Sequence, residues 1–164
     1  MIKEILNFEM LLELAPQKIK DRFELLKTNP ENPVWHPEGS TYDHIKIVTE
    51  RLIITGDIDL IMSGFFHDLY KLETTKTNPK TGHPSAFGHE VGSARLVLEP
   101  DNQEFIKKMG ADVDIVHGIV KNHMRIKQIN EMRNIKQNEL KELVYFDKLE
   151  IFTRADTMLS EFNF

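Results

Sequence analysis

The sequence predicts an all-α protein, and two observations carry this prediction. Apolar residues recur at helical spacing along most of the chain, whereas the strict alternation of a half-buried strand is missing apart from short ambiguous pieces such as LVYF. With 164 residues, of which 40% are hydrophobic, the chain is long enough to bury one substantial core. We therefore expect a single compact helical domain over residues 1–164.

The first two helices are expected within residues 1–28. Apolar positions three and four residues apart predict helices over 2–14 and 16–28, and Pro16 suits the first turn of the second. The first helix carries three glutamates among its apolar residues, which indicates an amphipathic helix and not a signal peptide or a membrane span. The following segment, residues 29–39, holds three prolines and one glycine and should form an ordered loop.

The next two helices are framed by capping residues. Ser40 or Thr41 is the expected N-cap of a helix that runs to about Thr55, where Gly56 ends it. Asp57 can cap the helix after that, which contains the dipeptide His-Asp in the stretch FFHDLYK. The dipeptide is thus predicted to lie on a largely apolar helix.

The second half of the chain combines one irregular segment with further helices. The helix with the His-Asp pair fades near Glu73. Residues 74–88 are polar, contain two prolines and two glycines, and look too irregular for regular structure, so their length makes them a candidate lid or substrate loop. Helical spacing then returns over residues 88–98, 101–109, 111–124 and 138–160.

Composition excludes several classes of function. The formal net charge of −5 argues against a protein that binds nucleic acid stably, because neutralising phosphates requires a basic surface. A small phosphorylated substrate stays compatible, since bound metal ions would add positive charge. The chain has no cysteine, so disulfides, thiolate catalysis and thiolate zinc sites are impossible. We expect a cytoplasmic protein without membrane attachment, and a homodimer is an open alternative.

Six histidines and aspartates are candidate metal ligands: His44, His67, Asp68, His89, His123 and Asp156. His44, His123 and Asp156 each share a helical stripe with apolar residues, and any one of them alone could be a core residue satisfied by a hydrogen bond. Burying a carboxylate without a partner is costly, however. The coincidence of three such residues with the pair His67-Asp68 is better explained by a shared cation.

The donor types narrow the choice of metal. Imidazole and carboxylate without sulfur suit Mn²⁺, Fe²⁺, Co²⁺, Ni²⁺ or Zn²⁺, whereas Mg²⁺ prefers oxygen and is less natural. Six ligands suit two ions ~3.5–4 Å apart. The conservative alternative is one ion held by four of them: His44, His67, Asp68 and Asp156. The other two histidines would then contact substrate. Three further histidines lie in loops or off the stripes and are not counted as ligands: His36, His83 and His117.

The order H…HD…H…H…D resembles the HD superfamily of metal-dependent phosphohydrolases. The segments HPEGSTYDH, FFHDLYK and KTNPKTGHPSAFGHEVGSARLV resemble the HD domain of bacterial CCA-adding tRNA nucleotidyltransferases, and IVKNHM and RADT resemble its later histidine and aspartate segments. The similarity spans about residues 35–157 and extends to HD-type diadenosine tetraphosphate hydrolases, whose sites hold two metals. Tyr70 stands where glycine is common, and no nucleotidyltransferase domain precedes this region, so CCA addition is not expected.

This resemblance implies roles for individual residues. The family's four core metal ligands match His44, His67, Asp68 and Asp156. Its added pair of histidines matches His89 and His123. Lys71 matches the lysine that lies near the substrate phosphate. Arg95 and Arg125 follow ligand histidines closely enough to reach phosphate, and Glu38 could bind substrate or organise the surrounding loop. Each of the three cations could instead be a solvated surface side chain.

The expected function is hydrolysis of a phosphomonoester or phosphodiester in a nucleotide, a cyclic nucleotide or an RNA end. Metal ions would lower the pKa of a bound water, Asp68 would orient that water, and Lys71 would stabilise charge on the phosphate. Two alternatives stay open. One is an HD oxygenase whose di-iron site activates O₂, and the other is a nucleotide-binding regulatory domain without turnover. Anaerobic assay distinguishes the first, and the cost of burying six ionisable groups without a metal argues against the second.

Overall fold

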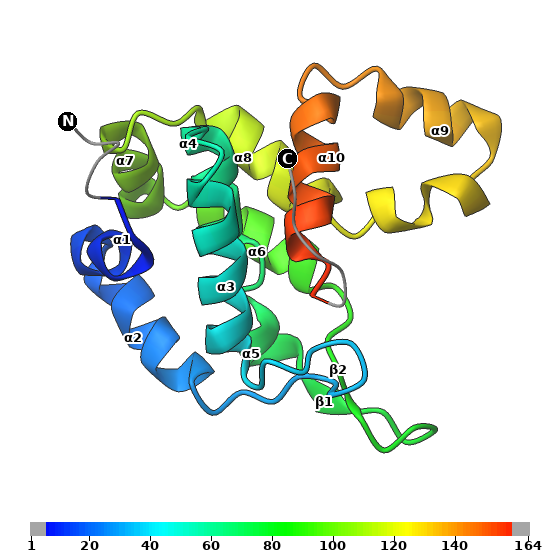
Figure 1. The fold of residues 1–164 in the computed structure, drawn as a ribbon, viewed down its shortest axis with the longest axis horizontal. Coiled ribbons are helices and arrows are strands. Elements are labelled where there is room, and N and C mark those ends of the chain that lie inside the picture. Colours follow the sequence, from blue (N-terminus) through cyan, green and yellow to red (C-terminus); the bar gives the residue numbers. More distant parts are fainter. Residues whose placement is uncertain (1–5, 159–164) are drawn as a thin grey trace.

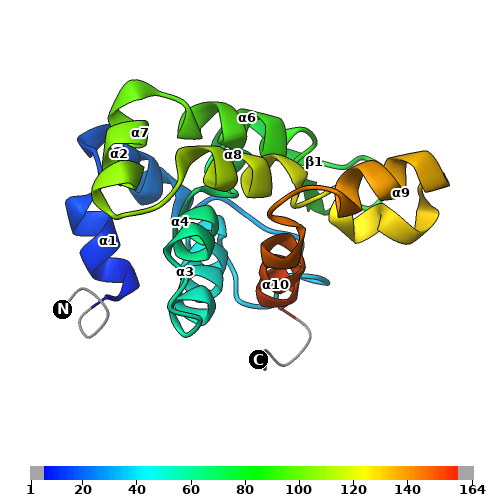
Figure 2. The same ribbon diagram turned by 90° about the horizontal axis from the view of Figure 1, so that it is seen from above.

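Two antiparallel helices, α3 (Thr41–Ile53) and α4 (Ile58–Phe66), form the centre of the fold in the computed structural model, which describes residues 6–158 (Figures 1 and 2). The remaining elements, in chain order, are α1 (Phe8–Leu14), α2 (Gln17–Leu26), α5 (Lys71–Thr74), β1 (Lys76–Thr77), β2 (Pro84–Ser85), α6 (His89–Val97), α7 (Pro100–Lys108), α8 (Val113–Asn122), the 3₁₀ helix η2 (Ile126–Glu131), α9 (Asn134–Lys141) and α10 (Phe146–Asp156). The prediction of an all-α fold is confirmed.

Side-chain caps start both central helices. Ser40 accepts a hydrogen bond from the backbone N–H of Asp43, and the Asp43 carboxylate accepts one from the backbone N–H of Ser40, both at 3.1 Å. This reciprocal pair is a capping box. Asp57 caps α4 by accepting from two backbone N–H groups of its first turn. Gly56, with φ 68°, makes the left-handed turn between the two helices. The structure thus selects Ser40 over Thr41 and confirms Asp57 and Gly56.

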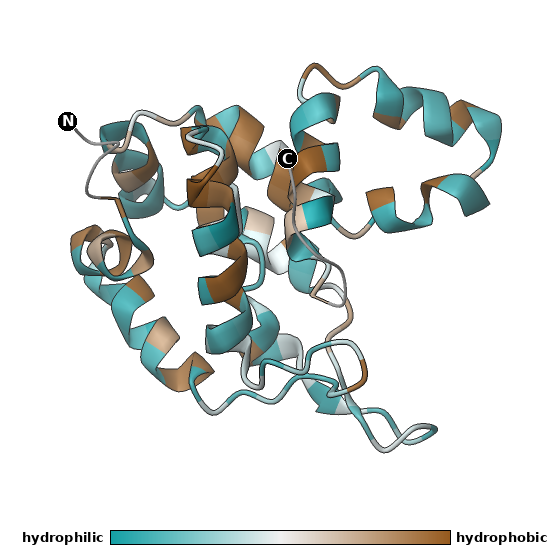
Figure 3. Cartoon of the chain, viewed as in Figure 1, coloured by the Kyte–Doolittle hydropathy of each residue, from teal (hydrophilic) through white to brown (hydrophobic). Residues whose placement is uncertain are grey.

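The other helices pack around this central pair. Helices α1 and α2 cover one side of α3, α8 packs against α4 and α6, and α10 packs against α3 and α8. Apolar residues gather on the helix faces that turn inward (Figure 3). The largest fully buried side chains include five phenylalanines: Phe8, Phe23, Phe65, Phe66 and Phe152. The interior therefore fixes the relative positions of α3, α4, α8 and α10, on which the site depends.

The predicted helix through the His-Asp pair is interrupted at that pair. Helix α4 ends at Phe66, His67 is its C-cap, and a turn leads to the short α5. In this turn the backbone N–H groups of Leu69 and Lys71 donate to carbonyls three residues earlier, so the helical ladder tightens. The single continuous helix to Glu73 was therefore wrong.

Other predicted boundaries shift as well. Pro16 is the N-cap of α2, one position before its first turn. The predicted helix 138–160 is two helices, α9 and α10, separated by a turn at 142–145. Residues 74–88 contain a small antiparallel hairpin, which pairs β1 with β2. The predicted positions 2–5 and 159–160 lie outside the described residues.

The segment containing η2 and α9 extends away from the body beside α10 (Figures 1 and 2). Of this segment, η2 packs against α10. This segment, residues 126–141, is called the arm, and it is largely hydrophilic (Figure 3). Within residues 6–158, no helix combines the length and apolar character needed to cross a bilayer.

A buried contact between Gly92 and Tyr70 makes the packing of α6 testable. A Cβ atom at Gly92 would overlap the Tyr70 ring. We predict that Gly92→Ala lowers the free energy of unfolding by about 1–3 kcal/mol, measured by urea denaturation, because the ring or the helix must move. This loss opposes the higher helix propensity of alanine. In a Tyr70→Ala background the same methyl group should cost little; an undiminished cost there would contradict the proposed contact.

Candidate metal centre

The six predicted ligands are all buried and converge on one point of the interior, although they come from five helices. Most of them lie at helix ends: His67 is the C-cap of α4, His123 the C-cap of α8, His89 the first residue of α6 and Asp156 the last of α10. His44 lies inside α3 and faces the same point. Residues far apart in sequence therefore meet because helix packing brings these ends together.

Every one of the four imidazoles is oriented by a hydrogen bond through Nδ1. In three of them Nδ1 faces a carbonyl oxygen three residues earlier: Gly64 O for His67 (2.7 Å), Ala86 O for His89 (2.7 Å) and Val120 O for His123 (2.6 Å). A carbonyl only accepts, so Nδ1 carries the proton and donates it. His44 Nδ1 faces the Glu38 carboxylate at 2.7 Å. All four Nε2 atoms are thereby turned toward the centre, as in histidines that bind metals.

The Nε2 atoms face one another in pairs. His44 Nε2 lies 3.2 Å from His67 Nε2, and His89 Nε2 lies 3.2 Å from His123 Nε2. When Nδ1 carries the only ring proton, both atoms of such a pair are acceptors, and two lone pairs repel at this distance. A proton or a metal ion between them removes the conflict. The pairs thus indicate a place for positive charge.

Asp68 stands between the two histidine pairs. Its Oδ2 lies 3.3 Å from His44 Nε2 and 3.2 Å from His67 Nε2, while its Oδ1 lies 3.0 Å from His89 Nε2 and 3.5 Å from His123 Nε2. Although it is buried, Oδ1 forms no hydrogen bond. Two groups able to hold a metal ion, each with ligand atoms within 4.8 Å of one another, share this one carboxylate. An orphaned oxygen that faces two imidazoles fits a bridging ligand.

Asp156 completes the first of these groups. Its Oδ1 lies 2.9 Å from His44 Nε2 and 3.3 Å from His67 Nε2. Its Oδ2 pairs with Lys127 Nζ at 2.8 Å. The carboxylate therefore faces the histidines with one oxygen and a lysine from η2 with the other.

Glu38 lies behind His44 and does not line the pocket that opens onto the cluster. Its Oε1 is 2.7 Å from His44 Nδ1 and 3.1 Å from His36 Nδ1, and the three residues form a further group with metal-ligand spacing. Because His44 uses Nδ1 here and Nε2 at the centre, Glu38 fits the carboxylate that orients a ligand histidine. The prediction that Glu38 contacts substrate is not supported by this position.

The two buried carboxylates of the cluster favour a positive charge at its centre. Burial opposes protonation of His67, but the Asp68 and Asp156 carboxylates outweigh it and raise the pKa of His67 to about 10. Burial lowers the pKa of His123 to about 4, so this ring is neutral. Burial also disfavours the Asp68 carboxylate, yet His67, Lys71 and His89 hold its pKa well below the usual value. Protons and divalent cations compete for such a site, since ligation requires free imidazole lone pairs.

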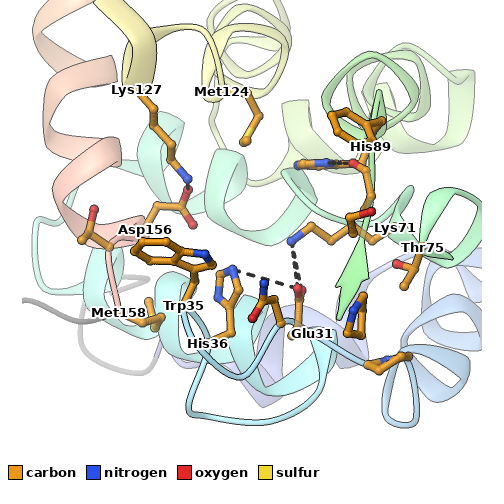
Figure 4. A pocket seen from close by; sticks show the side chains of 17 residues that line it. Glu31, Trp35, His36, Lys71, Thr75, His89, Met124, Lys127, Asp156 and Met158 are labelled. Atoms are coloured by element: carbon orange, nitrogen blue, oxygen red, sulfur yellow. Dashed lines mark hydrogen bonds and ion pairs between the residues drawn. The ribbon is translucent and has the colours of Figure 1, made fainter. Parts of the chain in front are cut away.

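A cavity of about 640 Å³ opens onto the cluster (Figure 4). His89 and Asp156 belong to both the cluster and the cavity wall. Lys71 and Lys127 extend into it from opposite sides, as Figure 4 shows. The volume falls within the range of small-molecule sites.

Lys71 is held between two carboxylates. Its Nζ lies 3.0 Å from Asp68 Oδ2 and 3.0 Å from Glu31 Oε1. Burial opposes its charge, but Asp68 and Glu31 outweigh burial and raise the pKa of Lys71, so the ammonium stays charged. The predicted position of Lys71 beside the ligand set is found.

The other predicted cations lie elsewhere. Arg95 and Arg125 are exposed and do not line the cavity, and Arg125 donates to Asn122 Oδ1 at 3.1 Å. Sequence reasoning missed Lys127 and Glu31, which do line it. The only signal for Lys127 was its closeness to His123, which Arg125 shares. The turn after α8 places Lys127 in the cavity wall and Arg125 beside Asn122, outside the cavity.

Comparison of the chain with protein-family models, with curated proteins and with solved structures finds no match. The site is therefore defined by its own geometry: an all-helical domain encloses buried histidine and aspartate groups that could hold metal ions. The group containing His44 and the group containing His89 are linked through Asp68.

We predict that the purified protein binds divalent transition ions and that Asp68→Ala removes most of this binding, because one carboxylate serves both groups. Elemental analysis and calorimetric titration with Mn²⁺, Co²⁺ or Ni²⁺ would measure it. His123→Ala should lose only part of the capacity. His117→Ala is the matched control, since His117 lies on the same helix but outside the clusters. Unchanged stoichiometry in a folded Asp68→Ala protein would contradict the shared site.

Proposed function

We propose that this protein is a metal-dependent phosphohydrolase of the HD superfamily that acts on a small phosphorylated substrate. One observation carries the proposal: the Asp68 carboxylate lies between two histidine pairs, and His89 of one pair lines a cavity that also contains Lys71 and Lys127. A site for two cations beside two ammonium groups suits a phosphate, which carries negative charge on several oxygens.

The donor set fits divalent transition ions. It consists of imidazole nitrogen and carboxylate oxygen, which suit Mn²⁺, Fe²⁺, Co²⁺, Ni²⁺ or Zn²⁺ better than Mg²⁺. The side chains that would hold them are His44, His67, Asp68 and Asp156 for one ion and Asp68, His89 and His123 for the other. Bound ions supply an activated water and neutralise charge on phosphoryl oxygens.

Local charge supports the same function. Four carboxylates face the cluster or its lysines, those of Glu31, Glu38, Asp68 and Asp156, against the two ammonium groups. Without metal ions, protonation of His67 offsets part of this negative charge. Divalent cations would add positive charge beside the two lysines, so phosphate binding should depend on metal. This dependence of phosphate binding on metal follows from the structure of the site, because the fold fixes the positions of the carboxylates.

The protein groups have separable roles in this proposal. Asp68 offers its unpaired Oδ1 beside His89, which lines the cavity, and there it can accept a hydrogen bond and position a water. Lys71 is buried and restrained by Glu31, so its charge is already in place before charge develops on the phosphate. Lys127 extends from the arm into the cavity on the side opposite Lys71. Its ammonium can leave Asp156 and bind a phosphate oxygen instead.

The two alternative functions predict different behaviour. Oxygen activation by a di-iron site has no need for two ammonium groups at the cavity wall, so Lys71 and Lys127 favour phosphate chemistry. A silent regulatory domain would bind nucleotide without product release. Assays under anaerobic conditions with Mn²⁺ separate hydrolysis from both alternatives, because only hydrolysis releases phosphate or alcohol without oxygen.

We predict that Asp68→Ala abolishes hydrolysis and that Lys71→Ala lowers kcat by on the order of 10²–10³ while metal content stays unchanged. The assay is a panel of phosphomonoesters, cyclic nucleotides and dinucleoside polyphosphates with Mn²⁺, Co²⁺ or Ni²⁺. Lys121→Ala, which removes an exposed lysine of α8, is the control. Wild-type turnover in Lys71→Ala would show that Lys71 does not contribute to catalysis. Full activity in a folded Asp68→Ala protein would refute the mechanism.

Lys127 and Arg125 give a second matched pair. We predict that Lys127→Ala raises KM about 10-fold or more, since it removes a charge-assisted contact to phosphate. Arg125→Ala should leave KM unchanged, because its side chain contacts Asn122 outside the cavity. Steady-state kinetics on the best substrate of the panel measures both. Equal effects of the two substitutions would show that long-range charge, and not contact, is responsible.

A further inference from the structure

Two large aromatic side chains at the mouth of the cavity take no part in the core. Trp35 is 60% exposed and Phe87 is 87% exposed, yet both line the cavity. Neither belongs to the hydrophobic core or stacks on another ring among residues 6–158. Exposed aromatic rings of this size carry a cost in water and often mark a binding surface.

The fold holds both rings close to the reaction centre. Trp35 precedes His36 in a loop where the backbone N–H groups of both residues donate to Asn32 O, at 3.2 and 2.9 Å. Phe87 follows Ala86, whose carbonyl accepts the His89 Nδ1 hydrogen bond, and precedes Gly88, which has φ 80°. Backbone positions that are already fixed reduce the entropy lost when a ligand binds.

The cavity thus has a charged part beside the metal-ligand cluster and an apolar rim at the two aromatic rings. The charged part carries Lys71 and Lys127, and Met124 and Met158 add further apolar lining. A ligand that fits both must be charged at one end and flat and apolar at the other. A sugar phosphate would leave the rim in water, and an alkyl phosphate would cover it without the planar stacking that two exposed rings offer.

We propose that Trp35 and Phe87 stack on a planar ring of the substrate, so that the cavity selects a nucleoside phosphate over a sugar phosphate. This inference rests on the proposed phosphohydrolase function and adds the group that is recognised away from the phosphate. Stacking on an aromatic side chain contributes binding without base-specific hydrogen bonds, so it selects for a ring and tolerates different bases. The cavity volume of about 640 Å³ accommodates a ligand of this size.

The sequence supplies a direct probe for this contact, because Trp35 is the only tryptophan in the chain. Its fluorescence therefore reports on one point of the rim. AMP and ribose 5-phosphate are titrated into the Zn²⁺-loaded protein, since Zn²⁺ has no redox chemistry, and released phosphate is measured in the same samples. We expect saturable quenching by AMP and none by ribose 5-phosphate.

Variants of Phe87 test the second ring without altering the fluorophore. Phe87→Ala should weaken the AMP response about 10- to 100-fold, the usual range for loss of one stacking ring, and Phe87→Tyr should restore it. Val91→Ala is the matched control, because Val91 is also exposed and apolar but does not line the cavity. None of these substitutions touches a metal ligand, so metal content should be constant.

The outcomes separate this inference from the function on which it rests. Phosphate release from AMP and ribose 5-phosphate with equal KM, without quenching, would overturn ring recognition and leave hydrolysis intact. Quenching by AMP without phosphate release from any substrate would support ring recognition and contradict hydrolysis. A fluorescence change that follows protein concentration without nucleotide, together with a dimer in sedimentation, would show that the rim contacts a second copy and would also overturn the inference.

Discussion

The Asp68 carboxylate buried among four imidazoles is the interaction on which the rest of the site depends. A buried carboxylate is costly unless positive charge or hydrogen bonds compensate it. Here one oxygen, Oδ1, has no hydrogen bond, and the facing Nε2 atoms offer lone pairs to one another. The protein alone satisfies this arrangement only by taking up protons, as the raised pKa of His67 indicates. Divalent cations satisfy the same groups without protonation, so metal binding and stability of the folded centre should be linked.

Helix ends explain why the ligands are so well oriented. The last carbonyls of a helix have no partner within that helix. At the end of α4, Gly64 O accepts the Nδ1 proton of His67, and at the end of α8, Val120 O accepts that of His123. One hydrogen bond thus satisfies an orphan carbonyl, fixes the tautomer and turns Nε2 toward the centre. The helix break at the His-Asp pair is therefore part of the site, because a continuous helix would leave Gly64 O bonded within its own ladder.

The sequence was sufficient to predict the fold class and to name the six residues that the structure brings together, because both depend on local pattern. Helical spacing shows which face of α3 carries His44, and the cost of a buried carboxylate drew attention to Asp156. The interruptions at 67–70 and 142–145 were missed, since apolar spacing continues through both turns. Lys127 and Glu31 could not be predicted, because their positions depend on where an arm and a proline-rich loop fold back. For the same reason the sequence could not show that Arg95 and Arg125, which also follow candidate ligand histidines closely, lie outside the cavity.

The origin of the side chains also separates the candidate metal centre from the rest of the cavity wall. The candidate metal ligands come from core helices or their ends, where packing leaves little freedom. Most other residues that line the cavity come from segments outside the core helices: the loop before α3, the segment before α6, the turn and arm after α8, and residues 157–158 after α10. Substitutions in those segments can change which molecule is bound without disturbing Asp68 and its histidines, because few core contacts depend on them. Trp35, Phe87 and Lys127 are therefore the positions at which specificity should be separable from metal binding, while the centre tolerates almost no change.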